Sequence, residues 1–173
     1  MSTYTARPIT AEVLQQLRTV DDSGRAMEPC TAGDEAGSPL RCCLWEIREG
    51  ERVALVSYAP LRRWAAERGA HPGAYDEAGP VFIHAGDCGG PDTSDEGKYP
   101  CARPGALRVV RRYDTEGHII GGRQLTLPDD PQRALNEALA EAFADPRTSL
   151  AHVRAVEYGC FHFEVRPLAG TRP

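Results

Sequence analysis

The stretch GPVFIHAGDC, residues 79–88, carries an imidazole and a thiol four positions apart at the end of an apolar run. A nucleophilic thiol must be a thiolate, and a neighbouring imidazole can lower its pKa and then shuttle the proton. Gly86 allows a turn between the two residues. We therefore take His84 and Cys88 as candidate catalytic residues. The alternative is a hydrogen-bonded histidine beside a thiol that only packs.

A zinc-like metal site is a second interpretation of the same two residues. Zinc binds neutral histidine and deprotonated cysteine at tetrahedral angles, so it needs one or two further donors. The candidates for these places are Cys43, Cys101, Cys160 and His162. None of the six cysteines forms a CxxC pair. The spacing therefore assigns no metal ligand, and the sequence indicates no particular cofactor.

Two further groups of residues suggest additional hypotheses. Cys160, His162 and Glu164 alternate along one run, which is more typical of a half-solvated strand face than of a metal site. Cys88 and Cys101 bracket a loop rich in glycine and aspartate. A reversible disulfide between them would close that loop.

Arginines in or beside the expected strands suggest the class of ligand. Arginine holds a carboxylate or a phosphate with two parallel hydrogen bonds, so converging arginines would select a small anionic molecule. The candidate substrate-binding residues are Arg41, Cys43, Arg112, Asp114 and Arg166. Arg112 and Asp114 could instead form an ion pair on the surface of a sheet.

The periodicity of apolar residues predicts an α+β fold, with a largely antiparallel sheet or a partly closed barrel built from hairpins. A short N-terminal helix is expected over 10–17 and one long helix over 131–144. The expected hairpins cover 43–58 and 106–125, and a buried strand is expected over 79–84. A helical turn or two is expected within 61–70. Irregular loops are expected over 21–39 and 86–105.

Composition narrows the class of protein further. The chain has 173 residues, which fits a single domain, and 41% hydrophobic residues, which fits a folded globular protein. Its formal charge of −5 argues against nucleic acid as a partner. Neither a signal peptide nor a membrane span is evident, so we expect a cytoplasmic protein. The phosphate-loop, dinucleotide, zincin and nucleophile-elbow motifs are missing from the sequence.

Several stretches, in this order, resemble a bacterial family known as domain of unknown function 1203. They are Cys43-Leu44 before a turn at Gly50-Glu51, residues 75–80 leading into GPVFIH and Cys88, RRYD at 111–114, and GCFHFEVR at 159–166. The resemblance covers about residues 40–166 and implies no activity. It implies a thiol at the position of Leu40 and a second one at Cys43. Cys42 could replace the first, but on a strand it would face away from Cys43.

Three hypotheses about function remain open at this stage. The leading one is an enzyme that acts on a small anionic metabolite by thiol or acid/base chemistry in a pocket near His84 and Cys88. The second is a non-catalytic domain that binds a ligand or a partner. The third is a zinc-like site made of cysteine and histidine. Oligomeric state does not follow from the sequence.

Overall fold

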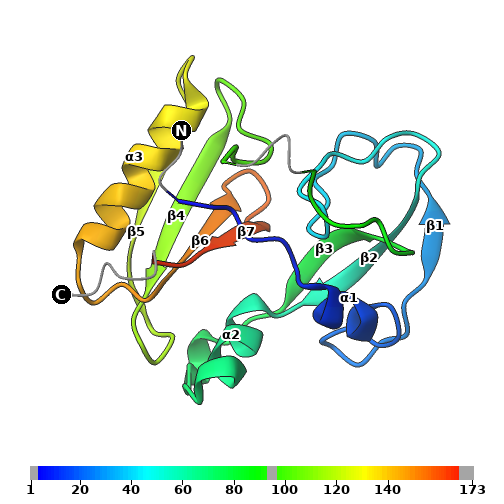
Figure 1. Ribbon diagram of the computed structural model, residues 1–173, viewed down its shortest axis with the longest axis horizontal. Helices are drawn as coiled ribbons and strands as arrows, with labels where there is room; N and C mark the ends of the chain where they lie inside the picture. The colour runs from blue at the N-terminus through cyan, green and yellow to red at the C-terminus, as the bar shows by residue number, and fades with distance from the viewer. Residues whose placement is uncertain (1–3, 93–96, 168–173) are drawn as a thin grey trace. The chain divides into compact units, whose positions relative to one another are not determined.

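The computed structural model describes residues 4–92 and 97–167, and the chain divides into two compact units (Figure 1). The three-stranded unit comprises residues 8–59 and 78–95, and the four-stranded unit comprises 1–7, 60–77 and 96–173. The expectation of a single domain stays a prediction. Within the described ranges, no helix is both long enough and apolar enough to cross a membrane.

The three-stranded unit contains an antiparallel sheet in the order β1-β2-β3. Its strands are β1 (Pro29–Thr31), β2 (Arg52–Tyr58) and β3 (Gly79–His84). Val53 pairs with His84, so the imidazole lies at the last register position of the β2–β3 ladder. Val81 and Ile83 point into the core, whereas Phe82 and His84 share the other, half-buried face, as strand alternation predicts.

Helix α1 (Ala11–Leu17) confirms the expected N-terminal helix. The Thr10 side chain accepts a hydrogen bond from the backbone N–H of Val13, which satisfies one of the unpaired donors of the first turn. Leu14 and Leu17 are its buried residues. The apolar stripe therefore determined both the place of this helix and the face that it buries.

The hairpin expected over 43–58 is wrong in its first half. Residues 41–44 form a turn, and β2 pairs with β1 and β3 instead of a strand at 43–48. The partner strand β1 lies within 21–39, so that segment is not wholly irregular. The buried Asp21 carboxylate also fastens it, because it accepts backbone hydrogen bonds from Ser23, Arg25 and Ser57.

The four-stranded unit contains an antiparallel sheet in the order β5-β4-β6-β7. The strands are β4 (Leu107–Tyr113), β5 (Ile119–Thr126), β6 (Leu150–Ala155) and β7 (Phe161–Val165). The β4–β5 pair confirms the hairpin expected over 106–125. Its tight turn holds Gly117 at φ +87°, where a side chain would meet Pro72, Leu61 and Trp64.

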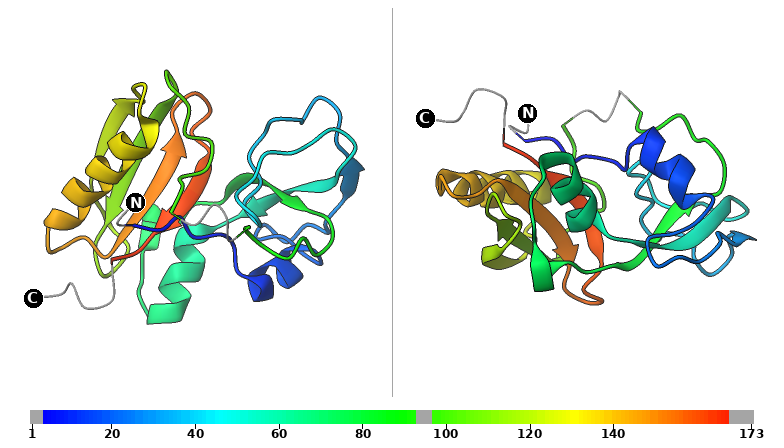
Figure 2. Two further views of the ribbon diagram at one scale, coloured as in Figure 1. Left: turned by 45° about the horizontal axis from the view of Figure 1, so that its top comes forward. Right: turned by 90° about the horizontal axis from the view of Figure 1, so that it is seen from below.

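The helices of this unit are α2 (Pro60–Arg68), the short 3-10 helix η1 (Gly73–Tyr75) and α3 (Pro131–Ala144). Figure 2 shows α3 lying along the sheet beside β4 and β5. Leu135, Ala138 and Leu139 are buried on its inner face. The two sheets of the described chain are open and antiparallel. The α+β class is thus confirmed, and the alternative of a closing barrel is not.

A buried polar pair crosses the β6–β7 ladder. His152 pairs in register with Glu164, and its Nε2 lies 3.5 Å from the Glu164 carboxylate. His152 is 1% exposed and packs between the rings of Tyr113 and Phe161. His162 and Glu164 are each 7% exposed, so the expected half-solvated face of this last strand is wrong. The reason is that β7 is buried on both faces.

The stability of the four-stranded unit should decrease on acidification because of this pair. Burial lowers the pKa of His152 below the ordinary 6.5. Burial raises the pKa of Glu164, but contact with His152 and the charge of Arg166 together hold it below 4.5. Below pH 6.5 the histidine therefore takes up a proton more readily in the unfolded chain than in the folded one, which lowers the free energy of unfolding. Below pH 4.5 the stabilisation from the ionised Glu164 is lost as well.

The measurement is urea unfolding followed by the fluorescence of the buried Trp64 in a Trp45→Phe background. The free energy of unfolding should fall as the pH is lowered through 6.5, and His152→Gln should flatten that part of the profile. The exposed His71 serves as the control, and His71→Gln should leave the profile unchanged. Identical profiles for His152→Gln and the parent would contradict the assignment.

Candidate functional site

The turn at residues 41–44 is held against strand β3. The backbone N–H of Arg41 donates to the carbonyl oxygen of Phe82 at 3.0 Å, and Leu40 forms an isolated parallel β-bridge with Phe82. The backbone N–H of Leu40 also donates to the carbonyl oxygen of Trp45 at 2.8 Å, which closes the turn. Cys42 and Cys43 follow this anchor directly and therefore meet His84, two residues beyond Phe82.

Four side chains form a compact group that we call the thiol–imidazole cluster, namely Cys42, Cys43, His84 and Cys88. The His84 Nδ1 lies 3.4 Å from the sulfur of Cys42 and 3.8 Å from that of Cys43. The two sulfurs are 4.0 Å apart. All four donor atoms, including the Cys88 sulfur, lie within 4.8 Å of one another.

Backbone N–H groups point at all three sulfurs of the cluster. His84 donates to Cys42 at 3.2 Å, and the backbone N–H groups of Trp45 and Gly90 act to lower the pKa of Cys43 and Cys88. The latter two donors each lie two residues after the cysteine that they contact. Such donors stabilise negative charge on sulfur, because a hydrogen bond to the charged form favours that form.

Backbone conformation explains how the N–H groups of Trp45 and Gly90 are directed toward the cysteines that precede them. Leu44 has φ 65° and Gly89 has φ 74°, so Cys43 and Cys88 are each followed by a residue in the left-handed region. For glycine this conformation has little cost, whereas for leucine it is strained. Leu44 is one of two non-glycine residues with positive φ in the described chain. Strain of this kind is typical of functional sites.

Two residues orient the His84 end of the cluster. The Glu51 carboxylate lies 3.5 Å from Nε2 of His84 and also accepts the backbone N–H of Arg48 at 2.9 Å. With Nε2–H directed at the carboxylate, Nδ1 presents its lone pair to the sulfurs. The Arg18 guanidinium donates to the backbone carbonyls of His84 and Gly86 at 3.2 and 2.6 Å, which fastens the segment leading to Cys88.

The thiols differ in their proton affinity. A hydrogen bond from the Cys42 thiol lowers the pKa of Cys43, and the same contact together with burial raises the pKa of Cys42. Burial also raises the pKa of Cys88. The direction at Cys88 is opposite to the one that a nucleophilic thiol needs near neutral pH.

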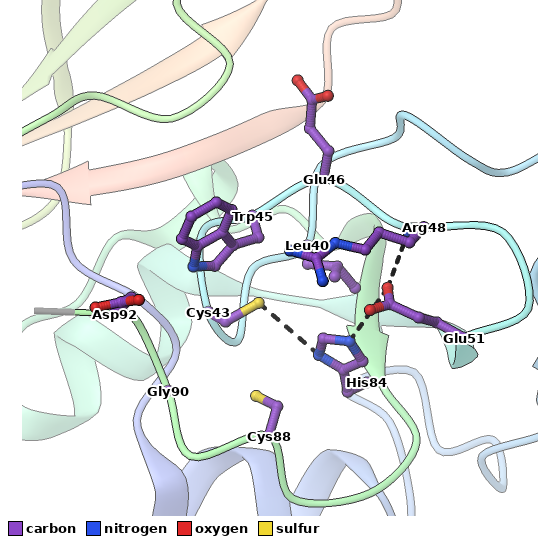
Figure 3. Close-up of a pocket in the computed structure, with 10 residues that line it drawn as sticks. All are labelled: Leu40, Cys43, Trp45, Glu46, Arg48, Glu51, His84, Cys88, Gly90 and Asp92. Atoms are coloured by element: carbon purple, nitrogen blue, oxygen red, sulfur yellow. Dashed lines mark hydrogen bonds and ion pairs between the residues drawn. The ribbon is translucent and has the colours of Figure 1, made fainter. Parts of the chain in front are cut away.

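A cavity of about 450 Å³ opens beside the cluster. Its lining includes Cys43, His84 and Cys88, together with Trp45 and Arg48 (Figure 3). Leu40, the position where the resemblance implies a thiol, lines the same cavity. The expected pocket at the end of β3 is therefore present within the three-stranded unit.

The other predicted substrate-binding residues lie elsewhere. Buried Arg41 donates to the carbonyl oxygen of Pro39. Arg112, Asp114 and Arg166 belong to the four-stranded unit. There Arg112 pairs with Asp145 at 3.0 Å and not with Asp114, whose carboxylate accepts two backbone N–H groups of its own turn.

Arg166 is also engaged, because it pairs with Glu164 at 2.5 Å and with Glu67 at 2.8 Å. The roles assigned to these residues in binding a substrate stay predictions. Cys101, Cys160 and His162, the suggested extra metal ligands, also belong to the four-stranded unit. All six cysteines are free thiols, so a Cys88–Cys101 disulfide stays a prediction too.

Sequence reasoning missed three residues of this site and misplaced a fourth. Glu51, Arg48 and Trp45 gave no signal, because contact with His84 or the cavity depends on the turn at 41–44. Cys42 was expected to face away from Cys43 on a strand, which is wrong. In a turn, neighbouring side chains need not alternate, so both thiols reach His84.

Fold and site together define an α+β protein with a cysteine–histidine cluster beside a cavity. The chain belongs to the family described as protein of unknown function DUF1203, whose model matches residues 37–166. This agrees with the resemblance noted from the sequence. No curated protein and no solved structure matches the chain.

Removing the Cys42 side chain should destabilise the protein even without any metal. Cys42 is 1% exposed, and its sulfur accepts the N–H of His84, which alanine would leave unpaired. Cys42→Ala should lower the free energy of unfolding in the presence of a chelator by about 1–3 kcal/mol. Cys30 is exposed, so Cys30→Ala should change it by less than about 0.5 kcal/mol. Equal effects in urea unfolding would contradict the buried placement.

Proposed function

We propose that the thiol–imidazole cluster binds a soft divalent metal ion of the zinc type. The observation that carries the proposal is the convergence of three sulfurs and one imidazole nitrogen within 4.8 Å. A tetrahedral zinc ion with Zn–S bonds of about 2.3 Å holds its sulfurs about 3.8 Å apart. The separations among Cys42, Cys43 and His84, 3.4 to 4.0 Å, are close to this spacing.

The chemistry of the donors favours zinc over harder cations. Three thiolates and an imidazole suit zinc, whereas magnesium and calcium prefer oxygen ligands. Backbone N–H groups directed at each sulfur support the thiolate forms. Glu51 provides the outer partner that a metal-bound histidine usually has, because its carboxylate lies 3.5 Å from Nε2, the ring nitrogen that faces away from the sulfurs.

The test is metal binding by protein purified without a nickel column. The chain should bind about one Co²⁺ or Zn²⁺, with the absorption of tetrahedral, thiolate-bound Co²⁺. Glu51→Gln should weaken binding by about 10–100-fold, and loss of a ligand in Cys43→Ala or His84→Ala should weaken it more. The matched controls are Cys30→Ala and Cys160→Ala, which remove thiols outside the cluster and should bind as the parent does.

Two results would overturn this proposal. One is a parent chain that binds no Co²⁺ although circular dichroism shows it folded. The other is binding that the control variants weaken as much as Cys43→Ala does. Each variant is compared by circular dichroism and by urea unfolding without metal, so that loss of a ligand is separated from loss of the fold.

A second candidate is a thiol enzyme in which His84 serves as the base. The cavity beside the cluster favours it, because that cavity gives a small molecule access to His84 and to two thiols. The thiol in contact with His84 that also lines the cavity is Cys43, at 3.8 Å from Nδ1. Among the contacts of the described residues, none brings Cys88, the nucleophile expected from the sequence, as close to the imidazole of His84.

Alkylation with iodoacetamide separates the two candidates. With the metal proposal, adding Zn²⁺ should protect Cys42, Cys43 and Cys88 and leave the labelling of exposed Cys30 unchanged. The thiol enzyme instead requires metal-free Cys43 to react faster than Cys30 at neutral pH, and His84→Gln to abolish that advantage. Labelling of Cys43 that is slower than that of Cys30, and insensitive to His84→Gln, would exclude the enzyme. Tandem mass spectrometry of the labelled peptides measures the rates of all four thiols.

A further inference from the structure

Cys88 differs from the other members of the cluster in its position. Cys42 and Cys43 are 1% and 4% exposed and follow the anchored turn, whereas Cys88 is half-buried in the segment after β3. The close contacts of 3.4, 3.8 and 4.0 Å join Cys42, Cys43 and His84. These three donors form a triangle of close contacts, and Cys88 completes the group within 4.8 Å.

The cavity opens on the Cys88 side of this triangle. Its lining includes Cys43, His84 and Cys88 but not Cys42. In Figure 3 the Cys88 thiol lies beneath the Cys43 sulfur, and no side chain is drawn between them. A metal ion held by the triangle would therefore have its fourth position toward the cavity, where a small molecule could replace Cys88. A fourth position that can open is typical of reactive rather than structural zinc sites.

The walls of the cavity indicate what such a molecule would carry. Arg48 is the one cation among the described lining residues, and no described residue forms an ion pair with its guanidinium. Figure 3 shows Arg48 reaching from its loop toward the space between Trp45 and His84. Trp45, 40% exposed, adds an apolar wall.

Three carboxylates also line the cavity and must be weighed against Arg48. Glu51 is engaged by His84 and by the backbone of Arg48. Glu46 points away from the cluster, and Asp92 lies beyond Gly90, on the side of the cavity away from Arg48 (Figure 3). Within the described lining, the guanidinium of Arg48 thus supplies the positive charge, whereas the other guanidinium near Cys88, that of Arg18, is engaged by the backbone carbonyls of His84 and Gly86.

We propose that Cys88 is an exchangeable ligand and that the cavity binds a small thiol bearing a carboxylate. This inference rests on the metal site proposed above. The sulfur of this small thiol takes the fourth metal position, because a soft metal ion prefers a thiolate ligand. The carboxylate of the same molecule binds Arg48. In the exchange the bond from metal to Cys88 breaks and the bond to the incoming sulfur forms. The proton of the incoming thiol passes to Cys88, so no oxidant or reductant is needed.

The experiment uses Cys88→Ala loaded with Co²⁺ and titrated with two probes of opposite charge, 3-mercaptopropionate and 2-mercaptoethylamine. The variant should retain Co²⁺ through the other three ligands, and 3-mercaptopropionate should increase the sulfur-to-cobalt charge-transfer absorption. It should bind at least about tenfold more tightly than the amine. Cobalt remaining after desalting is measured in the same samples, so that stripping of the metal is recognised. Cys88→Ser provides a second variant if the alanine chain does not fold.

Arg48→Gln in the same background tests the carboxylate contact. It should reduce the preference for 3-mercaptopropionate to within about threefold. The matched control is Arg52→Gln, because Arg52 is exposed on β2 and lines no part of this cavity. That control should keep the full preference.

The outcomes separate this inference from the proposal beneath it. A parent chain that binds no Co²⁺ overturns the metal site itself. A parent that binds Co²⁺ while both Cys88 variants lose it shows that Cys88 is essential, which overturns only the exchange. Retained cobalt that responds to neither thiol, or a preference that Arg48→Gln leaves intact, overturns the proposed ligand.

Discussion

The site depends on one backbone contact, the hydrogen bond from the N–H of Arg41 to the carbonyl oxygen of Phe82. It joins a turn to a strand about forty positions later in the chain and sets the register between them. Because Cys42 and Cys43 follow directly, their sulfurs meet His84 at 3.4 and 3.8 Å. A turn held one residue out of this register would present different side chains to the imidazole.

Two effects oppose each other at the cluster: backbone N–H groups favour negative charge on sulfur, whereas burial disfavours it. Burial and the Cys43 contact raise the pKa of Cys42, and burial raises that of Cys88. Backbone N–H groups offset part of this effect, and the left-handed conformation of Leu44 is part of the geometry that directs one of them. A bound cation would compensate the remaining cost, since burial of uncompensated charge is unfavourable. This balance links the strained turn to the proposed metal ion.

The four-stranded unit shows a different use of buried polar groups. His152 and Glu164 face each other across β6 and β7, and Arg166 pairs with Glu164 at the end of β7. The arginines considered for a substrate are occupied there by carboxylates, as Arg112 is by Asp145. The cavity beside the cluster is lined by another arginine, Arg48. Arg48 lies in a loop, so the strand pattern that selected the other arginines did not indicate it.

The sequence by itself determined the α+β class, the N-terminal helix and the β4–β5 hairpin, and it selected His84 and Cys88 as candidate site residues. These follow from local periodicity, capping and turn residues, which act over a few neighbours. Only the tertiary structure decided that Cys42 and Cys43 both face His84, that Glu51 lies behind it, and that β7 is buried on both faces. The physical reason is that each of these depends on hydrogen bonds or packing between segments far apart in the chain. No local pattern records which distant backbone groups a turn will meet.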